Sequence, residues 1–527
     1  MDDGWVSEPS ETAPEQLDPS GTLSRRALLA GLGVATVAGS GGTAWLLGAR
    51  PGGQRQGKAS AEPAWRSRRI TLAQWQASRG DRYYIAHRGS GDVRPEHTIA
   101  AYDAAMGWGA DAMEISTSST SDGVLICMHD LTYDRTTTGS GEIHAQPSSV
   151  LERIGVRQPQ LGPAWMRPPL PAVPRLQDVL QRYGARAVLC VEAKRDADYA
   201  AMIAMIEQHG LRESVIVKAF HTSNSIAAAQ RSGYPVFAYL GATDTDAGTV
   251  GELANRLDRD RDYLVLPTTR RADGGALMNP DVVHSAVQTG VPVWVYPVHR
   301  RSEADYFFSL GVQGVIAASL GYAMSRVPRS TRDTWASGAI ASGEMTRDPG
   351  LPSWQPQWAG ASLTLAAAAS QHFVTLGQFG PLAQAAASYQ VEFDAKWDVV
   401  TSDGSDHLDL VFGHLDDQYY EDGLSAGNGY HAVIRANGSL ELFSHRAGFA
   451  ESSSIAPSAS TPPAAAGQWM SFRLQVDPER ITWNRTDGGA AGSVTATDSS
   501  FRGGYLHIGR VSAGQQSSVT FRNLRVR

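Results

Sequence analysis

Two histidines near the start of the chain each follow a short apolar run. His87 comes after Tyr-Tyr-Ile-Ala, and His129 comes after Val-Leu-Ile-Cys-Met. A third apolar run ends at the carboxylate of Glu114. Histidine changes its protonation near neutral pH, and a carboxylate beside it can orient the ring or help to hold a cation. These side chains predict an acid–base site or a metal site.

One such histidine by itself would be explained as an ordinary polar residue at the end of a strand. Two of them, with Arg88, Glu96 and Glu192 in similar settings, favour a functional site. The functional interpretation therefore rests on the group and not on any single member.

The connection between Glu114 and His129 is too short for a crossover helix, so the two runs are expected to be antiparallel. Residues 120–123 contain Asp-Gly, a strong hairpin signal. A four-residue loop would set Glu114 opposite His129, whereas a two-residue loop would set Ser116 opposite His129. Either register places all three side chains on one face, within about 4.5–8 Å of one another.

The order of motifs in residues 84–141 resembles the glycerophosphodiester phosphodiesterase family. The chain reads IAHRG, RPEHT, GADAMEIS, TSDGVLICMHD and DRTTTGSG. The family reads roughly HRG, PENT, GAD-x-x-E-x-D, T-x-DG-x-x-V-x-x-HD and R-T-T-x-G-x-G. Several linked motifs in the same order are more specific than any one of them, and weaker similarity continues to about residue 325.

This resemblance implies an enzyme that hydrolyses glycerophosphodiesters to glycerol 3-phosphate and an alcohol, with a divalent cation, Ca²⁺ or Mg²⁺. One histidine would take a proton from the attacking hydroxyl, and the other would protonate the leaving alkoxide. The residues implied are His87, His129 and Arg88 for catalysis, Arg88 and Lys194 for phosphate binding, Glu114, Glu192 and Ser116 for the metal, and Glu96, Asp130 and Trp294 in support.

The chain departs from the family at Ser116, where the E-x-D motif has its aspartate. Hard cations favour carboxylate oxygens, so the serine is expected to weaken the metal site. Its hydroxyl, Glu96 or a water could fill the position. The options are a working enzyme with a weaker metal, a different metal arrangement, or a barrel that has lost catalysis. Retention of the other signature groups favours a working enzyme.

Strand-like and helix-like patterns alternate over residues 65–326 and predict a (β/α)8 barrel. The polar residues that follow the apolar runs would then line the barrel mouth. Residues 141–172 are long, Pro-rich and irregular, which is typical of a loop that covers a site. Cys127 and Cys190 each precede a site residue by two positions and are expected to point into the barrel, as packing residues or as a disulfide.

Length and composition limit the class of protein. A chain of 527 residues suggests two or three domains, and 42% hydrophobic residues suffice for globular cores. The net charge of −7 argues against nucleic acid as a partner. Two cysteines exclude a disulfide scaffold.

Residues 1–61 are expected to hold a disordered leader, an export signal or anchor, and a spacer. Ser-Arg-Arg at 24–26 precedes an uncharged run over 27–48, a pattern that resembles a twin-arginine export signal. A Sec signal or an uncleaved membrane anchor is the alternative. The sequence therefore predicts an exported or cell-surface protein.

After a linker at 327–360, residues 361–527 show short alternating runs separated by turn signals and predict a β-sandwich. The order of these runs resembles laminin-G or concanavalin-like jelly rolls. Such sandwiches often bind glycans, so Tyr419, Tyr420 or Trp483 could stack on sugar if exposed, whereas a packing role is the alternative.

Two other functions remain open from the sequence. The barrel could be an inactive envelope protein that binds glycan or phosphate. It could also be a phospholipase like the spider-type sphingomyelinases D, which share this barrel. The predicted partners are a glycerophosphodiester or a related phospholipid or teichoic-type substrate, with a glycan at the C-terminal domain.

Overall fold

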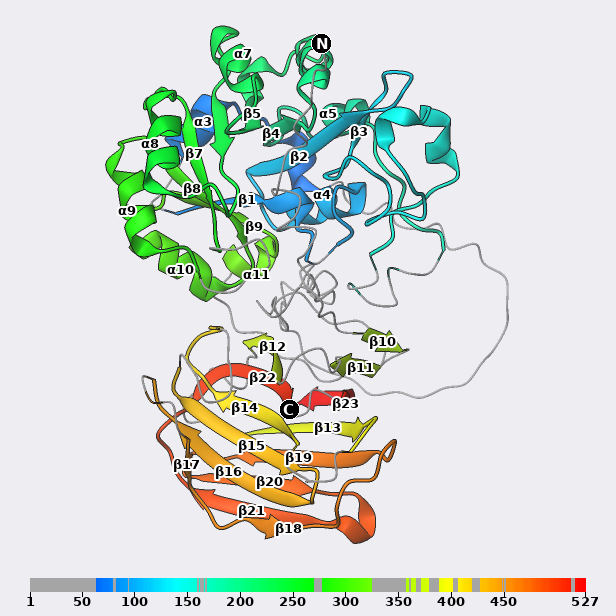
Figure 1. Ribbon diagram of the computed structural model, residues 1–527, viewed down its shortest axis with the longest axis vertical. Coiled ribbons are helices and arrows are strands. Elements are labelled where there is room, and N and C mark those ends of the chain that lie inside the picture. Colours follow the sequence, from blue (N-terminus) through cyan, green and yellow to red (C-terminus); the bar gives the residue numbers. More distant parts are fainter. Residues whose placement is uncertain are drawn as a thin grey trace, which may run out of the picture.

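The computed structural model describes residues 63–527, apart from residues 79–81, 93, 159–160, 162–164, 166–167, 270–276, 325–356, 360–361, 366–370, 379–387, 401–405, 419–426, 448, 450–451 and 513–516. Two bodies lie one above the other, a barrel and a pair of sheets (Figure 1). None of the described helices is long and apolar enough to cross a membrane. The predicted export signal and most of the predicted linker lie outside the described residues.

Eight parallel strands form the predicted barrel, which is thereby confirmed. They are β1 (Tyr83–Ala86), β2 (Ala112–Ser119), β4 (Val188–Ala193), β5 (Val215–Phe220), β6 (Val236–Tyr239), β7 (Tyr263–Pro267), β8 (Val293–Val298) and β9 (Gly314–Ala317). β1 pairs with both β9 and β2, which closes the barrel. The strands read as nearly continuous apolar runs because both faces of a parallel barrel are buried.

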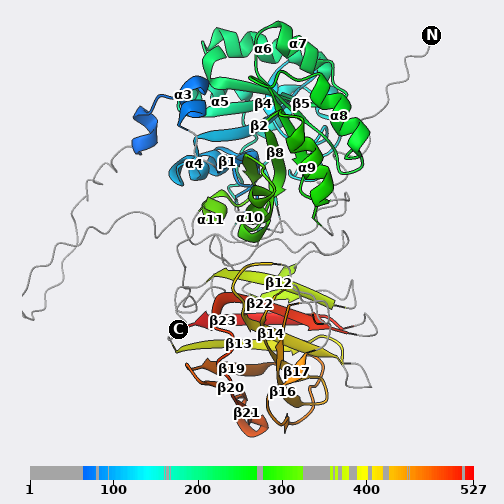
Figure 2. The same ribbon diagram turned by 90° about the vertical axis from the view of Figure 1, so that its left-hand side faces the viewer.

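Helices surround the strands (Figure 2) and bury their apolar faces against the outside of the barrel. The helices are α3 (Leu72–Ala77), α4 (Ile99–Gly107), α5 (Leu176–Tyr183), α6 (Tyr199–Gln208), α7 (Ser225–Arg231), α8 (Ala247–Asn255), α9 (Pro280–Gln288), α10 (Arg301–Ser309) and α11 (Leu320–Met324). Short 3-10 turns include η1 (Ala64–Ser67), η2 (His87–Gly89), η3 (Ile143–Ala145), η4 (Ser148–Glu152), η7 (Asp196–Asp198) and η8 (Arg212–Ser214).

The predicted hairpin is present, since β3 (Leu125–Cys127) runs antiparallel to β2, but both predicted registers are wrong. Thr117 lies opposite Cys127, and the ladder ends there. The loop after Ser119 is closed by a hydrogen bond from the Thr120 backbone N–H to the Val124 carbonyl. His129 therefore lies beyond the strand, and the chain after the ladder brings it to the site.

This register also corrects the expected positions of the cysteines. Cys190 lies inside the barrel with Ile216 and Phe237, as predicted. Cys127 instead packs in the layer between sheet and helices, because Thr117 opposite it faces outward. Both cysteines are free, so they form no disulfide.

The C-terminal region forms two antiparallel seven-stranded sheets around one shared apolar core. The first sheet holds β10 (Gln357–Ala359), β11 (Ser362–Leu365), β23 (Val519–Val526), β13 (Tyr389–Trp397), β19 (Met470–Val476), β20 (Arg480–Arg485) and β21 (Gly492–Thr497). The second holds β12 (Gln371–Gln378), β22 (Gly503–Val511), β14 (His407–Gly413), β15 (Gly429–Arg435), β16 (Ser439–His445) and β17 (Ser453–Ser454), with β18 (Ala459–Ser460) beside β16. Another 3-10 turn, η10, spans Gly488–Ala490.

Alternating burial along β13 shows why these strands form half-buried sheets: every second side chain faces the shared core. Trp483 belongs to that core and is fully buried, so the condition for stacking on sugar is not met and the packing alternative holds for this residue. Tyr419 and Tyr420 lie outside the described residues. The likeness to laminin-G or concanavalin-like jelly rolls and a glycan ligand stay predictions.

A loop after β14 of the second sheet contacts the barrel. Both carboxylate oxygens of Asp417 accept hydrogen bonds from the first backbone N–H groups of α10, Arg301 at 2.9 Å and Ser302 at 2.8 Å. The Tyr322 hydroxyl of α11 donates to the same carboxylate.

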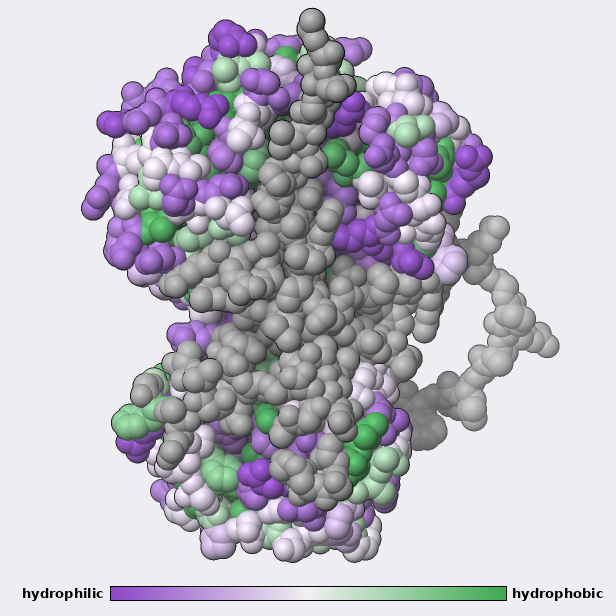
Figure 3. Space-filling view, in the orientation of Figure 1, coloured by the Kyte–Doolittle hydropathy of each residue, from purple (hydrophilic) through white to green (hydrophobic). Residues whose placement is uncertain are grey.

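Many of the described side chains on the outer surface of the barrel are hydrophilic (Figure 3).

Candidate active site

The predicted catalytic residues lie around the ends of the first barrel strands. His87 and Arg88 form the 3-10 turn directly after β1, and Glu114 lies within β2. Glu192 lies near the end of β4, with Lys194 just beyond it. Carboxyl ends of parallel strands meet at one rim of a barrel, so these side chains converge although the sequence separates them widely.

A sharp left-handed turn sets the first two residues. Arg88 has φ 51°, and Gly89 and Ser90 both have φ 77°. A side chain at Gly89 would meet the Cβ of Ala101 at 2.9 Å, so glycine lets the turn pack against α4. The turn points the Arg88 backbone N–H at Glu114 Oε2, 3.1 Å away.

His129 is oriented by its neighbour. Its Nδ1 lies 2.9 Å from Asp130 Oδ1, and because a carboxylate only accepts, Nδ1–H donates and Nε2 keeps the lone pair. Burial, with the charges of Arg88 and Lys194, lowers the pKa of His129 to about 3. The neutral imidazole has a fixed tautomer that presents Nε2 as a proton acceptor, although its low pKa makes it a weak base in the free site.

Arg135 fixes Asp130 in turn. Its guanidinium contacts Asp130 at 2.6 Å and Glu96 at 2.7 Å. Burial acts to raise the pKa of Asp130, but Arg135 and the hydrogen bond from His129 hold it below its usual range. Arg135 belongs to the DRTTTG motif, yet sequence reasoning gave it no role.

Glu96 connects this group to Arg88. Its Oε1 lies 3.1 Å from Arg88 Nη1. The side chain of Gln158, from the long irregular connection, donates to Glu96 Oε2 at 3.0 Å and accepts from the Glu96 backbone N–H at 2.9 Å. The connection therefore covers this edge of the site, in agreement with the role expected from its length. Glu96 thus pairs with Arg88, Arg135 and Gln158 and does not supply the carboxylate that is missing at Ser116.

His87 faces the carboxylate of Glu114, with Nε2 and Oε2 3.7 Å apart. Burial acts to raise the pKa of Glu114, but Lys218, His87 and Arg88 outweigh it and hold the pKa well below its usual range. Glu114 is thus a buried anion next to His87, whereas the sequence analysis expected it beside His129.

A further cationic residue lies between the two glutamates, and the sequence analysis did not identify it. Lys218 on β5 places Nζ 3.0 Å from Glu114 and 3.0 Å from Glu192. The signal was a lysine inside the apolar run VIVKAF, because a fully buried lysine needs carboxylate partners. Lys194, predicted to bind phosphate, lies 3.1 Å from the other oxygen of Glu192.

These residues do not fit the divalent cation that the resemblance implied. Ca²⁺ takes about six to eight oxygen ligands. Here both oxygens of Glu192 and one oxygen of Glu114 are paired with ammonium groups, and the other Glu114 oxygen accepts from the Arg88 backbone N–H. The Ser116 hydroxyl lies 3.4 Å from Glu192. Among the described residues, no group of three or more His, Cys, Asp or Glu side chains is placed to hold a metal ion.

Trp294, predicted as a supporting residue, lies elsewhere. It is fully buried in the interior cluster with Trp75 and Tyr83 near the start of the strands. Its indole fills the space that the absent side chain of Gly314 leaves, with the rings 2.3 Å from where a Cβ would lie. Trp294 therefore packs the barrel core and does not reach the mouth.

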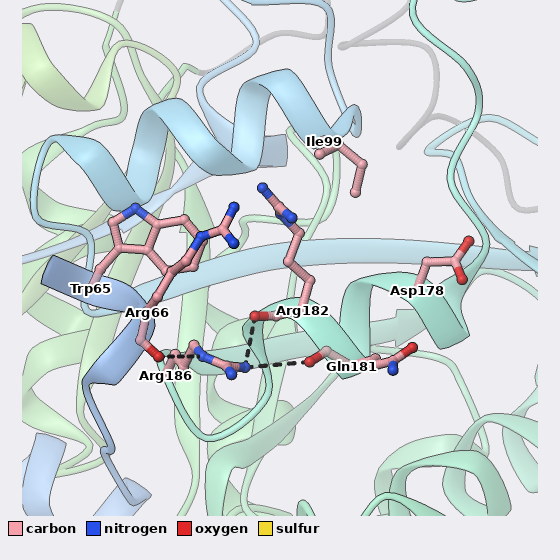
Figure 4. A pocket seen from close by; sticks show the side chains of 7 residues that line it. All are labelled: Trp65, Arg66, Ile99, Asp178, Gln181, Arg182 and Arg186. Carbon is pink, nitrogen blue, oxygen red and sulfur yellow. Dashed lines mark hydrogen bonds between the residues drawn. The ribbon is translucent and has the colours of Figure 1, made fainter. Parts of the chain in front are cut away.

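Another pocket, of about 430 Å³, lies between η1, α4 and α5 on the outside of the barrel (Figure 4). It is lined by Trp65, Arg66, Ile99, Asp178, Gln181, Arg182 and Arg186. Arg186 donates to backbone carbonyls, and Arg182 forms a two-bond pair with Asp103. These arginines stabilise the helix layer, and no predicted catalytic group lines the pocket.

A closed parallel barrel whose mouth carries buried histidines, carboxylates and cationic side chains has the make-up of a barrel enzyme. Residues 87–319 match the model of the Glycerophosphoryl diester phosphodiesterase family. The barrel is thus similar to this family over most of its length, and the resemblance seen in the motifs is confirmed.

Individual proteins are similar to the same part of the chain. A Bacillus subtilis protein named "Glycerophosphodiester phosphodiesterase" is 26% identical over 252 residues, 44% of this chain and 81% of its own. A Mycobacterium tuberculosis protein named "Probable glycerophosphodiester phosphodiesterase 1" is 44% identical over 75 residues, 14% of this chain and 27% of its own. A solved glycerophosphodiester phosphodiesterase from Agrobacterium tumefaciens aligns over 45% of this chain and 96% of its own, with a TM-score of 0.35 and 23% identity. The chain thus spans about a quarter of the mycobacterial relative and most of the Bacillus one.

Proposed function

We propose that the protein hydrolyses glycerophosphodiesters, giving glycerol 3-phosphate and an alcohol. The observation that carries this proposal is the hydrogen bond from His129 Nδ1 to Asp130, which leaves the buried, neutral Nε2 as a proton acceptor beside Arg88 and Lys194. The family match of the barrel supports the substrate class.

The phosphodiester carries a negative charge that the site must offset before a nucleophile can approach. Arg88 supplies a planar guanidinium whose position is set by Glu96. Lys194 adds an ammonium held by Glu192. These groups are fixed before substrate arrives, so little reorganisation is needed during the reaction.

Proton transfer follows from the same geometry. His129 Nε2 removes a proton from the attacking water while the water oxygen bonds to phosphorus. The bond from phosphorus to the leaving oxygen breaks, and His87 donates a proton to that oxygen. Glu114 Oε2 lies 3.7 Å from His87 Nε2 and faces that ring across the site. Each proton transfer is typically worth about 10²–10⁴-fold in rate.

The test measures release of glycerol 3-phosphate from glycerophosphocholine and glycerophosphoglycerol by the full chain. His87→Asn and His129→Asn are each expected to lower kcat by about 10²–10⁴-fold. His144→Asn is the control, because that ring lies exposed on η3. Full turnover in either active-site variant would contradict the assigned roles. Release of choline from sphingomyelin would indicate the phospholipase alternative, and no turnover of any diester would favour the binding protein.

We place this activity outside the cytoplasm, because of the Ser-Arg-Arg sequence and the uncharged run over 27–48. Substitution of Arg25 and Arg26 by lysine is expected to retain the protein inside the cell, as measured by fractionation. Unchanged export would contradict a twin-arginine route.

A further inference from the structure

The Lys218 ammonium contacts both glutamates of the site. Its side chain is 2% exposed, as deep in the protein as the glutamates. A buried ammonium is costly unless carboxylates compensate it closely. The two distances of 3.0 Å show that this compensation is complete, and that Lys218 belongs to the site and not to the surrounding apolar core.

The sheet register brings Lys218 next to the departure from the family motif. Ser116 of β2 lies beside Glu192 of β4, and Glu192 lies beside Lys218 of β5. The three side chains therefore form one row across neighbouring strands. That row lacks the carboxylate that the family carries at Ser116 and contains an ammonium as well. Both features make the local charge more positive.

We propose that the Lys218 ammonium takes the place of the divalent cation, so that this site works without a bound metal. The part of this inference that concerns catalysis rests on the proposed function. The part that concerns cation binding is tested by binding measurements that need no enzymatic activity. Two glutamates and two lysines balance at the mouth, since Lys194 and Lys218 each pair with Glu192. A divalent ion would add two positive charges to a balanced group.

The aromatic side chain of Tyr239 helps to hold the Lys218 ammonium in place. Lys218 Nζ lies 3.9 Å from the centre of the Tyr239 ring, close enough for a cation–π contact. The Tyr239 hydroxyl donates to Glu192 at 2.5 Å and so orients that carboxylate as well. Lys218 therefore stays between the glutamates, with Arg88 and Lys194 as the cationic groups that meet the phosphate.

The first experiment uses the full chain after treatment with EDTA. Isothermal titration with Ca²⁺ and Mg²⁺, and Tb³⁺ luminescence, are expected to show no stoichiometric binding. Thermal unfolding is expected to be independent of Ca²⁺, and hydrolysis of glycerophosphocholine is expected to continue in EDTA. Binding of one Ca²⁺ per chain that is lost in Glu114→Gln would overturn the proposal, whatever the substrate is.

A paired variant tests the cause. Ser116→Asp with Lys218→Gln restores a carboxylate and removes the ammonium, so it is expected to create a Ca²⁺ site. Ca²⁺ at about 100 times its Kd should then raise Tm by roughly 5–10 °C. Lys396→Gln, in the C-terminal sheets, is the matched control and should stay unresponsive.

The outcomes separate this inference from the proposed function. If no glycerophosphodiester is hydrolysed but the wild-type chain binds no divalent cation, the function fails and the inference stands. If hydrolysis stops in EDTA and returns with Ca²⁺, the function stands and the inference fails. If the paired variant does not fold, the wild-type titration decides alone.

Discussion

His97 stands where the family motif has asparagine. Its ring is buried between η2 (His87–Gly89) and α4. Its Nδ1 lies 2.7 Å from the Tyr102 hydroxyl, and its backbone N–H donates to the Arg88 carbonyl at 2.9 Å. Burial lowers the pKa of His97 from 6.5 to about 3. The ring is thus neutral in the folded protein across a range in which the unfolded chain would protonate it.

We expect His97→Asn to reduce the loss of stability in acid. Between pH 6.5 and about 3 the unfolded chain binds a proton at His97 and the folded chain does not, so the free energy of unfolding falls as the pH falls. One such group contributes up to about 1.4 kcal/mol per pH unit. Urea unfolding at pH 6 and pH 4.5 measures the slope. His284→Asn, at an exposed position on α9, is the control, and equal slopes for His97→Asn and wild type would contradict this account.

At the scale of elements, the long connection between β3 and α5 is fastened to Glu96 by Gln158. That side chain is 1% exposed and makes both a donor and an acceptor contact with Glu96. Because Glu96 also pairs with Arg88 and Arg135, the connection stabilises the cationic groups of the mouth indirectly.

We expect Gln158→Ala to destabilise the protein by about 1–3 kcal/mol, because it leaves buried polar groups of Glu96 without two partners. Denaturant unfolding measures this change, and kcat/KM for a glycerophosphodiester should fall with it. Gln146→Ala is the matched control: its amide makes an exposed bond to the Ser140 carbonyl in the same connection. Equal effects of the two variants would show that Gln158 does not fasten the connection.

At the scale of the whole molecule, a carboxylate from the C-terminal sheets caps a helix of the barrel. Asp417 accepts from the first two N–H groups of α10, where a helix otherwise leaves its donors unpaired. Figure 2 shows α10 and α11 on the side of the barrel that faces the sheets. The two bodies are therefore joined by a buried charge and not only by surface contact.

We expect Asp417→Ala to weaken this junction by roughly 2–4 kcal/mol, because the helix donors and the Tyr322 hydroxyl lose a charged acceptor. Calorimetry should show the barrel and the sheets unfolding in more separate transitions than in wild type. Asp416→Ala should leave the profile unchanged, since that neighbour bonds only within its own loop at Gln418. Identical profiles for wild type and Asp417→Ala would exclude a coupling role.

The sequence by itself determined the barrel, the hairpin and the residues that follow the first strands. These features depend on local patterns: apolar runs, Asp-Gly turns and polar residues at strand ends. His87, Arg88, Glu114, His129 and Glu192 were identifiable because each belongs to a motif with fixed spacing.

Only the tertiary structure decided how those residues are used. A difference of one residue in loop length changes the hairpin register and moves every side chain to the other face of the strand. This shift placed Cys127 in the outer layer. Lys218 shares no motif with Glu114, and Asp417 lies more than a hundred residues from Arg301. Such pairings depend on which distant strands and helices become neighbours, and that follows from packing of the whole chain and not from any local pattern.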